Sequence, residues 1–294
     1  MTKVTPLAER STAAYGRAMG TVTVNDVQLE YLEAGPVDGP LALCLHGFPD
    51  SAHTFRFLLP TLASAGFHTV APFLRGYAPS AVPADGRYDQ VALAADANAL
   101  HAALGGDERA VIIGHDWGAG IAYGASASEP DRWRRVVAGA VPPTGAMASA
   151  FFDYDQIKRS FYIFFFQTPL AEMVVSMNDL EFIQRLWDDW SPGYANKEDV
   201  AYVKDALRDS ANLSAAIGFY RAIFTSGGIP GGGNQPTLYL HGTTDGCLSV
   251  DLARGAEAHL PPGSKVALIE GAGHFMHVEK PDEVNQLILD WVTA

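Results

Sequence analysis

The sequence predicts an α/β protein with a mostly parallel central β-sheet and helices on both of its faces. Short apolar runs alternate along the chain with longer segments whose apolar residues recur at helical spacing. Strands separated by helices usually lie parallel, because each helix carries the chain back to the edge of the sheet where the previous strand began. In addition, one apolar run enters a helix directly across a turn between Gly114 and Gly118.

The expected elements alternate on both sides of the middle of the chain. Strands are expected over residues 21–24, 27–33, 41–45, 68–72, 109–113, 135–141, 237–241 and 265–269. Helices are expected over 51–64, 89–104, 119–128, 250–259 and 281–292, with Ser51 as a candidate N-cap of the first. Asn25 and Asp26 separate the first two strands and predict a β-hairpin. Residues 1–20 carry no periodicity, so we expect a loosely ordered arm there.

The pattern changes over residues 144–225, which lack short β-branched runs and are rich in aromatic residues at mostly helical spacing. This change predicts a helical cap (lid) inserted into a core domain that comprises residues 1–143 and 226–294. The glycine-rich segment 227–233 is the expected linker. It is a poor candidate for a phosphate-binding loop, because no Lys-Ser or Lys-Thr follows its glycines.

Composition excludes several classes of protein. The chain has 294 residues and a formal net charge of −13, which argues against nucleic acid or an anionic membrane as a partner. Cys44 and Cys247 make no disulfide framework and are expected to be buried thiols. No signal peptide or membrane-spanning run is visible, so we expect a cytoplasmic protein. Metal-binding and dinucleotide motifs are absent from the sequence, so no metal and no cofactor is expected.

The turn between Gly114 and Gly118 carries an acid, Asp116, at the position where a serine nucleophile usually stands. A carboxylate there can attack a saturated carbon that bears a leaving group, and the product is an alkyl ester of the enzyme. Water must then cleave that ester. Epoxides and alkyl halides are therefore the expected substrates, whereas the alternative role for Asp116 is the N-cap of the following helix.

Cleavage of such an ester needs a base and an acid that orients it. His274 follows the last expected strand beside Gly273, and its intrinsic pKa suits base chemistry near neutrality. Asp245 follows the preceding strand and would hold the imidazole in the required tautomer. The chain order of nucleophile, acid and base matches hydrolases with this turn. The alternatives are a structural histidine and an ordinary turn aspartate.

Backbone N–H groups are expected to stabilise the oxygen of the attacked carboxyl group. One is the amide of Trp117, directly after Asp116, and the other comes from the Gly47-Phe48 loop after the third strand. Pro49 would hold this loop in place, and we expect a cis peptide bond between Phe48 and Pro49.

These motifs resemble the α/β-hydrolase-fold epoxide hydrolases over nearly the whole chain from about residue 21. His46-Gly47-Phe48-Pro49 is similar to their oxyanion loop, and Gly114-His115-Asp116-Trp117-Gly118 to their nucleophile turn. The resemblance implies the α/β-hydrolase fold and two cap tyrosines that hydrogen-bond the epoxide oxygen, placed at Tyr162 and Tyr220 by segments similar to the family's. The alternative is that both tyrosines are only pocket walls.

The resemblance leaves other functions open. Haloalkane dehalogenases share Asp116-Trp117 but often have Asn where Phe48 stands, and they lack the tyrosine pair; fluoroacetate dehalogenases tend to have Arg where Trp117 stands. A non-catalytic ligand receptor on the same fold is a third alternative. The expected partners are water and a small apolar epoxide, with a homodimer left open. The expected apolar substrate pocket is formed by Phe48, Trp117, Phe166 and Trp187.

Overall fold

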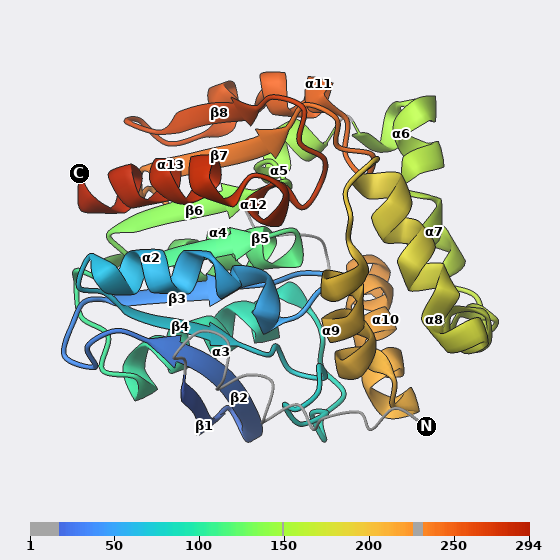
Figure 1. The fold of residues 1–294 in the computed structure, drawn as a ribbon, viewed down its shortest axis with the longest axis horizontal. Helices are drawn as coiled ribbons and strands as arrows, with labels where there is room; N and C mark the ends of the chain where they lie inside the picture. Colours follow the sequence, from blue (N-terminus) through green and yellow to red (C-terminus); the bar gives the residue numbers. More distant parts are fainter. Residues whose placement is uncertain (1–17, 149, 226–231) are drawn as a thin grey trace.

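The central sheet has eight strands in the order β1-β2-β4-β3-β5-β6-β7-β8 (Figure 1). The computed structural model describes residues 18–148, 150–225 and 232–294. The strands are β1 (Ala18–Val24), β2 (Val27–Ala34), β3 (Leu41–Leu45), β4 (His68–Pro72), β5 (Val111–His115), β6 (Arg135–Gly139), β7 (Thr237–Gly242) and β8 (Lys265–Ile269). β2 pairs antiparallel with β1 and β4, and the other neighbouring pairs are parallel. The predicted mostly parallel α/β architecture is confirmed.

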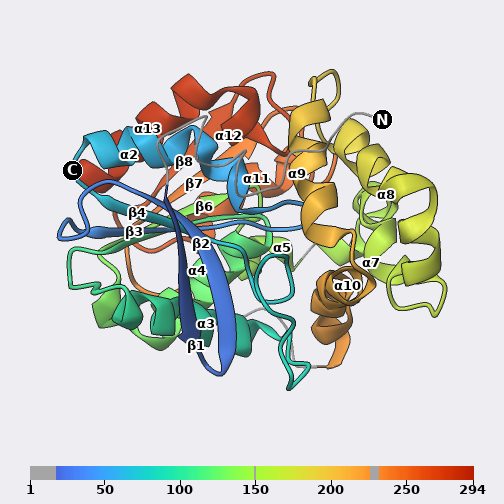
Figure 2. The same cartoon turned by 60° about the horizontal axis from the view of Figure 1, so that its bottom comes forward.

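Helices cover both faces of this sheet. Figures 1 and 2 show α2 (Leu58–Ser64) and α13 (Pro281–Thr293) on one face, and α3 (Gln90–Ala103) and α4 (Trp117–Ser128) on the other. Every residue of β3, β4 and β5 is buried. Continuous apolar strands are the expected consequence, because no side of a central parallel strand faces water.

Several expected boundaries differ from the observed ones. The β-hairpin is confirmed, with Asn25 and Asp26 both at positive φ, but β1 begins at Ala18, so the expectation of an arm through residue 20 is wrong for residues 18–20. Residues 1–17 lie outside the described residues. The expected helix 51–64 is divided into η1 (Ala52–Arg56) and α2, and the side chain of Ser51 makes no capping hydrogen bond.

Two further differences have local causes. β6 ends at Gly139, because Ala140 has a φ of 67° and turns the chain away from the sheet. The expected helix 250–259 is divided at Gly255 into α11 (Val250–Arg254) and η4 (Ala256–His259). The expected linker 227–233 lies largely outside the described residues.

The described residues between β6 and β7 are helical or irregular, with no strand among them. The helices are α5 (Thr144–Met147), η3 (Ala150–Phe152), α6 (Tyr154–Arg159), α7 (Phe161–Phe165), α8 (Ala171–Trp190), α9 (Lys197–Leu207) and α10 (Ser210–Thr225). Figure 1 shows α6 to α10 beside the carboxyl ends of the parallel strands. These helices therefore lie over the edge of the sheet where the nucleophile turn emerges.

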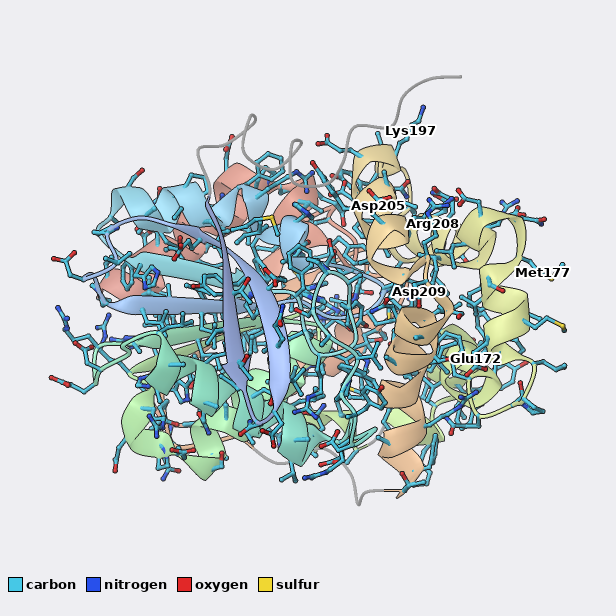
Figure 3. The ribbon with its side chains drawn as sticks, turned by 90° about the horizontal axis from the view of Figure 1, so that it is seen from below. Glu172, Met177, Lys197, Asp205, Arg208 and Asp209 are labelled. Carbon is cyan, nitrogen blue, oxygen red and sulfur yellow. The ribbon has the colours of Figure 1, made fainter. Side chains whose placement is uncertain are left out.

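Helix α8 contains a break that is tied to α9. Its residues Asn178, Asp179 and Leu180 have positive φ values, and Asp179 forms ion pairs with Lys204 and Arg208. Figure 3 shows the two helices from below, with Lys197 and Asp205 on α9 and Met177 on α8. In the part of the chain that the structure describes, no helix is long and apolar enough to cross a bilayer.

Candidate active site

The turn that carries Asp116 joins β5 to α4 in the strained geometry expected from its glycines. Asp116 has a φ of 54°. A Cβ at Gly114 would lie 1.9 Å from the carbonyl oxygen of Gly118, and a Cβ at Gly118 would lie 1.9 Å from that of Leu45. Both positions therefore require glycine. Asp116 occupies the N-cap position of α4, but its side chain makes no capping hydrogen bond, so the structure does not support the capping alternative.

The loop after β3 holds one oxygen of this carboxylate. The Phe48 N–H donates a hydrogen bond of 2.8 Å to Oδ1 of Asp116. A Cβ at Gly47 would lie 2.2 Å from the same oxygen, so the close approach depends on glycine there. The peptide bond between Phe48 and Pro49 is cis, as predicted. The second expected donor, the Trp117 amide, begins α4 directly after Asp116.

The structure brings His274 to the other oxygen of Asp116, and it brings Asp245 to the far side of the same imidazole. His274 Nε2 lies 3.5 Å from Oδ2 of Asp116, and Nδ1 of the same ring lies 2.9 Å from Oδ2 of Asp245. The second oxygen of Asp245 accepts hydrogen bonds from the amides of Cys247 (2.7 Å) and Leu248 (2.9 Å). These bonds orient the carboxylate, which in turn orients the imidazole.

The charge of the His274 imidazole depends on the neighbouring carboxyl groups of Asp116 and Asp245. Burial lowers the pKa of His274, but the negative charges of Asp245 and Asp116 outweigh it and raise the pKa to about 10. For Asp245, burial opposes ionisation, yet His274 holds the pKa of this carboxyl below its usual value. The imidazole of His274 is therefore a cation at neutral pH.

Tyr162 and Tyr220 line the same cavity as Asp116 and come from two different helices. Tyr162 comes from α7 and Tyr220 from α10, and their ring centroids are 5.4 Å apart. The hydroxyl of Tyr162 lies 3.5 Å from Sγ of Cys247, whereas that of Tyr220 has no hydrogen-bond acceptor among the described residues. Burial and Asp116 raise both tyrosine pKa values well above 10, so both groups keep their protons.

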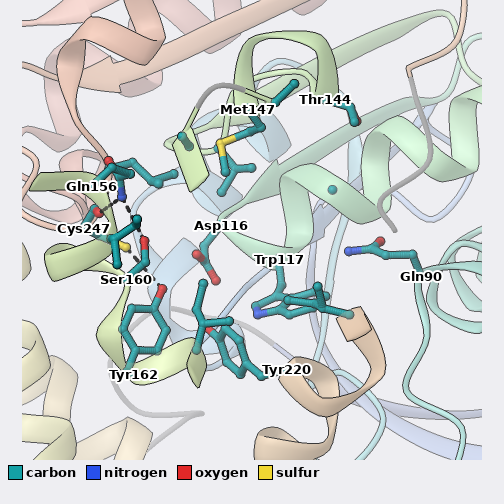
Figure 4. Close-up of a pocket in the computed structure, with 18 residues that line it drawn as sticks. Gln90, Asp116, Trp117, Thr144, Met147, Gln156, Ser160, Tyr162, Tyr220 and Cys247 are labelled. Carbon is teal, nitrogen blue, oxygen red and sulfur yellow. Dashed lines mark hydrogen bonds between the residues drawn. The ribbon is translucent and has the colours of Figure 1, made fainter. Parts of the chain in front are cut away.

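A cavity of about 240 Å³ lies between the nucleophile turn and the helices α5, α6, α7 and α10 (Figure 4). Its wall includes Asp116, Trp117, Tyr162 and Tyr220 and is otherwise mostly apolar. The residues of the wall that sequence reasoning missed include Gln90, Val141, Met147, Ile163, Ile223 and Leu248. Most come from segments correctly expected to be helical or turn, but no local pattern shows which side of a helix meets a cavity.

Three of the four expected pocket residues lie behind the cavity wall. Trp187 is fully buried, stacks on Phe275 at 3.4 Å and donates its indole N–H to the Pro49 carbonyl at 2.8 Å. Phe48 and Phe166 are also fully buried and pack edge-on against Tyr220. None of these three side chains is part of the wall of the cavity, and Trp117 alone of the four expected residues reaches it.

A group of buried polar side chains lies behind the turn. Asp50, His115 and His277 each offer an atom within 4.8 Å of the others, a spacing that could hold a metal ion. His115 donates to the carbonyl of His274 at 2.9 Å, and His277 is hydrogen-bonded to Thr54. Burial lowers the pKa values of both histidines and raises that of Asp50, which favours the neutral form of each group.

A mostly parallel sheet whose strand β5 meets α4 at a glycine-flanked turn is the architecture of α/β hydrolases. Residues 40–281 match the family model of the alpha/beta hydrolase fold. Epoxide hydrolase A of Mycobacterium tuberculosis is 32% identical over 317 residues, which cover 93% of this chain and 96% of that protein. Epoxide hydrolase 3 of Mus musculus is 31% identical over 273 residues, with coverage of 90% and 74%.

Solved structures agree with these relatives. The crystal structure of an epoxide hydrolase from Bacillus megaterium in complex with an inhibitor matches with a TM-score of 0.82 and 28% identity, covering 94% of this chain and 100% of that one. The chain therefore belongs to the α/β-hydrolase-fold epoxide hydrolase family and is a hydrolase.

Proposed function

We propose that this protein opens an epoxide to a vicinal diol through an alkyl ester on Asp116. The observation that carries the proposal is the placement of two protonated phenols, Tyr162 and Tyr220, on the same cavity as the free oxygen of a buried carboxylate. Helices from residues 144–225 act as the cap that supplies these phenols. The substrate is a small epoxide with apolar parts, and water is the second substrate.

In the first step, Oδ2 of Asp116 attacks an epoxide carbon while Oδ1 stays bound to the Phe48 amide. The C–O bond of the epoxide breaks, and its electron pair goes to the ring oxygen. Tyr162 and Tyr220 donate hydrogen bonds to that oxygen as its charge develops. General-acid assistance of this kind is worth about a hundredfold or more in rate.

In the second step, His274 becomes the base. Esterification removes the charge of Asp116, which is one of the two carboxylates that raise the pKa of His274. The pKa of the imidazole then falls, and the ring gives up a proton, which ends on the oxygen of the opened epoxide either directly or by way of a phenol. Neutral His274, still oriented by Asp245, takes a proton from water, which attacks the ester carbonyl. The amides of Phe48 and Trp117 stabilise the resulting oxyanion. The oxyanion then collapses and breaks the bond between the acyl carbon of Asp116 and the substrate oxygen. That oxygen takes the proton of His274 and leaves as the diol, and the proton of the new carboxyl group returns to the imidazole, which restores the starting charges.

Dehalogenation by the same nucleophile is the second candidate. Trp117 supports it, since this side chain lines the cavity and its indole N–H is a donor that could bind a halide. Phe48 offers no side-chain N–H, and a halide needs no phenol to protonate it. The tyrosine pair therefore favours the epoxide.

Two measurements test the proposal. A panel of aryl, aliphatic and fused-ring epoxides is incubated beside haloalkanes, with diol and halide measured in each reaction; we expect diol, and halide without diol would support the second candidate. A single turnover in ¹⁸O-labelled water is then followed by mass spectrometry of the protein and product. The ¹⁸O label should enter the carboxylate of Asp116 and leave the first diol unlabelled. If the label appeared only in the diol and never in Asp116, the covalent mechanism would be overturned.

A further inference from the structure

Gln90 carries a buried amide on the wall of the cavity, and no described residue is hydrogen-bonded to it. It is the first residue of α3, its side chain is 6% exposed, and it lines the cavity. Neither end of its carboxamide is hydrogen-bonded to a described residue, and Oε1 is fully buried. The cap of α3 is supplied by its neighbour Asp89, which accepts a hydrogen bond from the Ala92 amide at 3.1 Å, so capping does not explain Gln90.

A second glutamine on the same wall provides the contrast. The Gln156 amide donates to Ser160 Oγ and to the Cys247 carbonyl, both at 2.9 Å, and its Oε1 accepts from the Ser249 amide at 2.9 Å. Gln156 is therefore a structural residue whose carboxamide is hydrogen-bonded at both its nitrogen and its oxygen. Gln90 has no such hydrogen bonds to described residues, although burial of an unpaired amide is destabilising.

The position of Gln90 relative to the nucleophile is defined by α4. The Gln90 amide nitrogen lies 3.0 Å from the place where a Cβ at Gly120 would stand, so glycine leaves room for the carboxamide. Gly120 is one helical turn beyond Asp116, whose carbonyl accepts its N–H at 3.4 Å. Figure 4 shows Gln90 and Gln156 on opposite sides of Asp116, with Trp117 between Asp116 and Gln90 and the amide nitrogen of Gln90 directed inward.

We propose that Gln90 is a specificity-determining residue that binds a polar oxygen on the substrate, remote from the epoxide ring. The preferred substrates are then epoxides with an apolar linker that ends in a hydroxyl or carbonyl group, because the oxygen of that group accepts a hydrogen bond from the inward-facing amide nitrogen of Gln90 while the linker covers the apolar wall. The proposal rests on the proposed epoxide hydrolysis and names its substrate class.

The test compares two matched series of substrates. kcat/KM is measured for 1,2-epoxyalkanes of six, eight and ten carbons and for the same compounds with a terminal hydroxyl group, using wild type, Gln90→Leu and the control Gln286→Leu. Gln286 is exposed on α13 and binds only Asp290 among the described residues. Wild type and Gln286→Leu should prefer the hydroxylated compound at one chain length by about five- to tenfold.

Gln90→Leu should lose this preference and hydrolyse the plain epoxyalkane faster than wild type does. Its thermal midpoint should stay the same or rise, because leucine removes an unpaired buried amide; a large fall would assign Gln90 a structural role instead and overturn the inference. An equal preference in wild type and Gln90→Leu would also overturn it while leaving epoxide hydrolysis intact. Absence of diol from every compound would remove the proposed function and this inference together.

Discussion

Nε2 of His274 lies 3.5 Å from Oδ2 of Asp116 and makes no hydrogen bond of ordinary geometry. The same ring is bound to Asp245 through Nδ1 at 2.9 Å. Nε2 is therefore held beside Asp116 and, in the proposed mechanism, acts on a water molecule once Asp116 is esterified.

Removal of this imidazole should separate the two steps. In His274→Ala, Asp116 can still attack an epoxide, but no base activates water, so the ester should accumulate. Intact-mass spectrometry should show one added substrate mass per chain, located on Asp116 by peptide mapping. His259→Ala, an exposed histidine, is the control and should show no adduct at steady state. Normal diol production by His274→Ala would contradict the assigned base.

The tyrosine pair should govern the first step alone. Tyr162→Phe and Tyr220→Phe should each slow ring opening by about a hundredfold, and the double variant should nearly abolish it. Adduct formation measured in the His274→Ala background reports this step without the second one. Because the Tyr220 hydroxyl has no acceptor among the described residues, Tyr220→Phe should not lower the thermal midpoint. Undiminished adduct formation in the double variant would mean that the acid lies elsewhere.

The coupling of His274 to two carboxylates predicts a pH dependence of stability. The pKa of His274 is raised in the folded state, from 6.5 to about 10, so its ion pairs stabilise the fold fully below about pH 6.5. This contribution should be lost as the pH rises from 6.5 through 10. Denaturant unfolding across that range should show a falling free energy in wild type and a flatter profile in His274→Gln.

Asp116→Asn should mimic the charge of the ester intermediate. The substitution removes one of the two negative charges beside the imidazole, so the pKa of His274 should fall below that of wild type. An NMR titration of the imidazole would detect this change. An unchanged His274 pKa would contradict the proposed change of role from cation to base during the reaction.

Two glycines should have separable effects. In Gly47→Ala, a Cβ 2.2 Å from Asp116 Oδ1 displaces the nucleophile, and ring opening should fall by about a hundredfold with a smaller loss of stability. In Gly118→Ala, the added Cβ would lie 1.9 Å from the backbone carbonyl oxygen of Leu45, and the free energy of unfolding should fall by about 1–3 kcal/mol. Gly255→Ala is the control, since the nearest atom is 3.8 Å away. A Gly47→Ala variant with normal activity would contradict the assigned position of the nucleophile.

Local patterns predicted the elements that carry Asp116, Asp245 and His274, because strand and helix periodicity and turn glycines are properties of neighbouring residues. The same patterns placed helix boundaries less well. Ser51 was expected to cap a single helix, whereas the chain forms η1 and then α2. The residue at which a helix begins or ends depends partly on contacts with segments that are distant in the sequence. The residues of the helix itself do not specify those contacts.

The residues that line the cavity could not be predicted from the sequence alone. Trp187 and Phe166 are as aromatic as Trp117, yet both are fully buried away from the cavity, whereas Trp117 lines it. The sequence itself determined the order of the candidate groups along the chain, which is an acid at a glycine-flanked turn, then Asp245, then His274. The turn could be recognised from the sequence because only glycine fits the backbone on either side of the acid. Tertiary structure alone decided which side chains border the cavity and which charges meet, because burial and distance arise from segments that are remote along the chain.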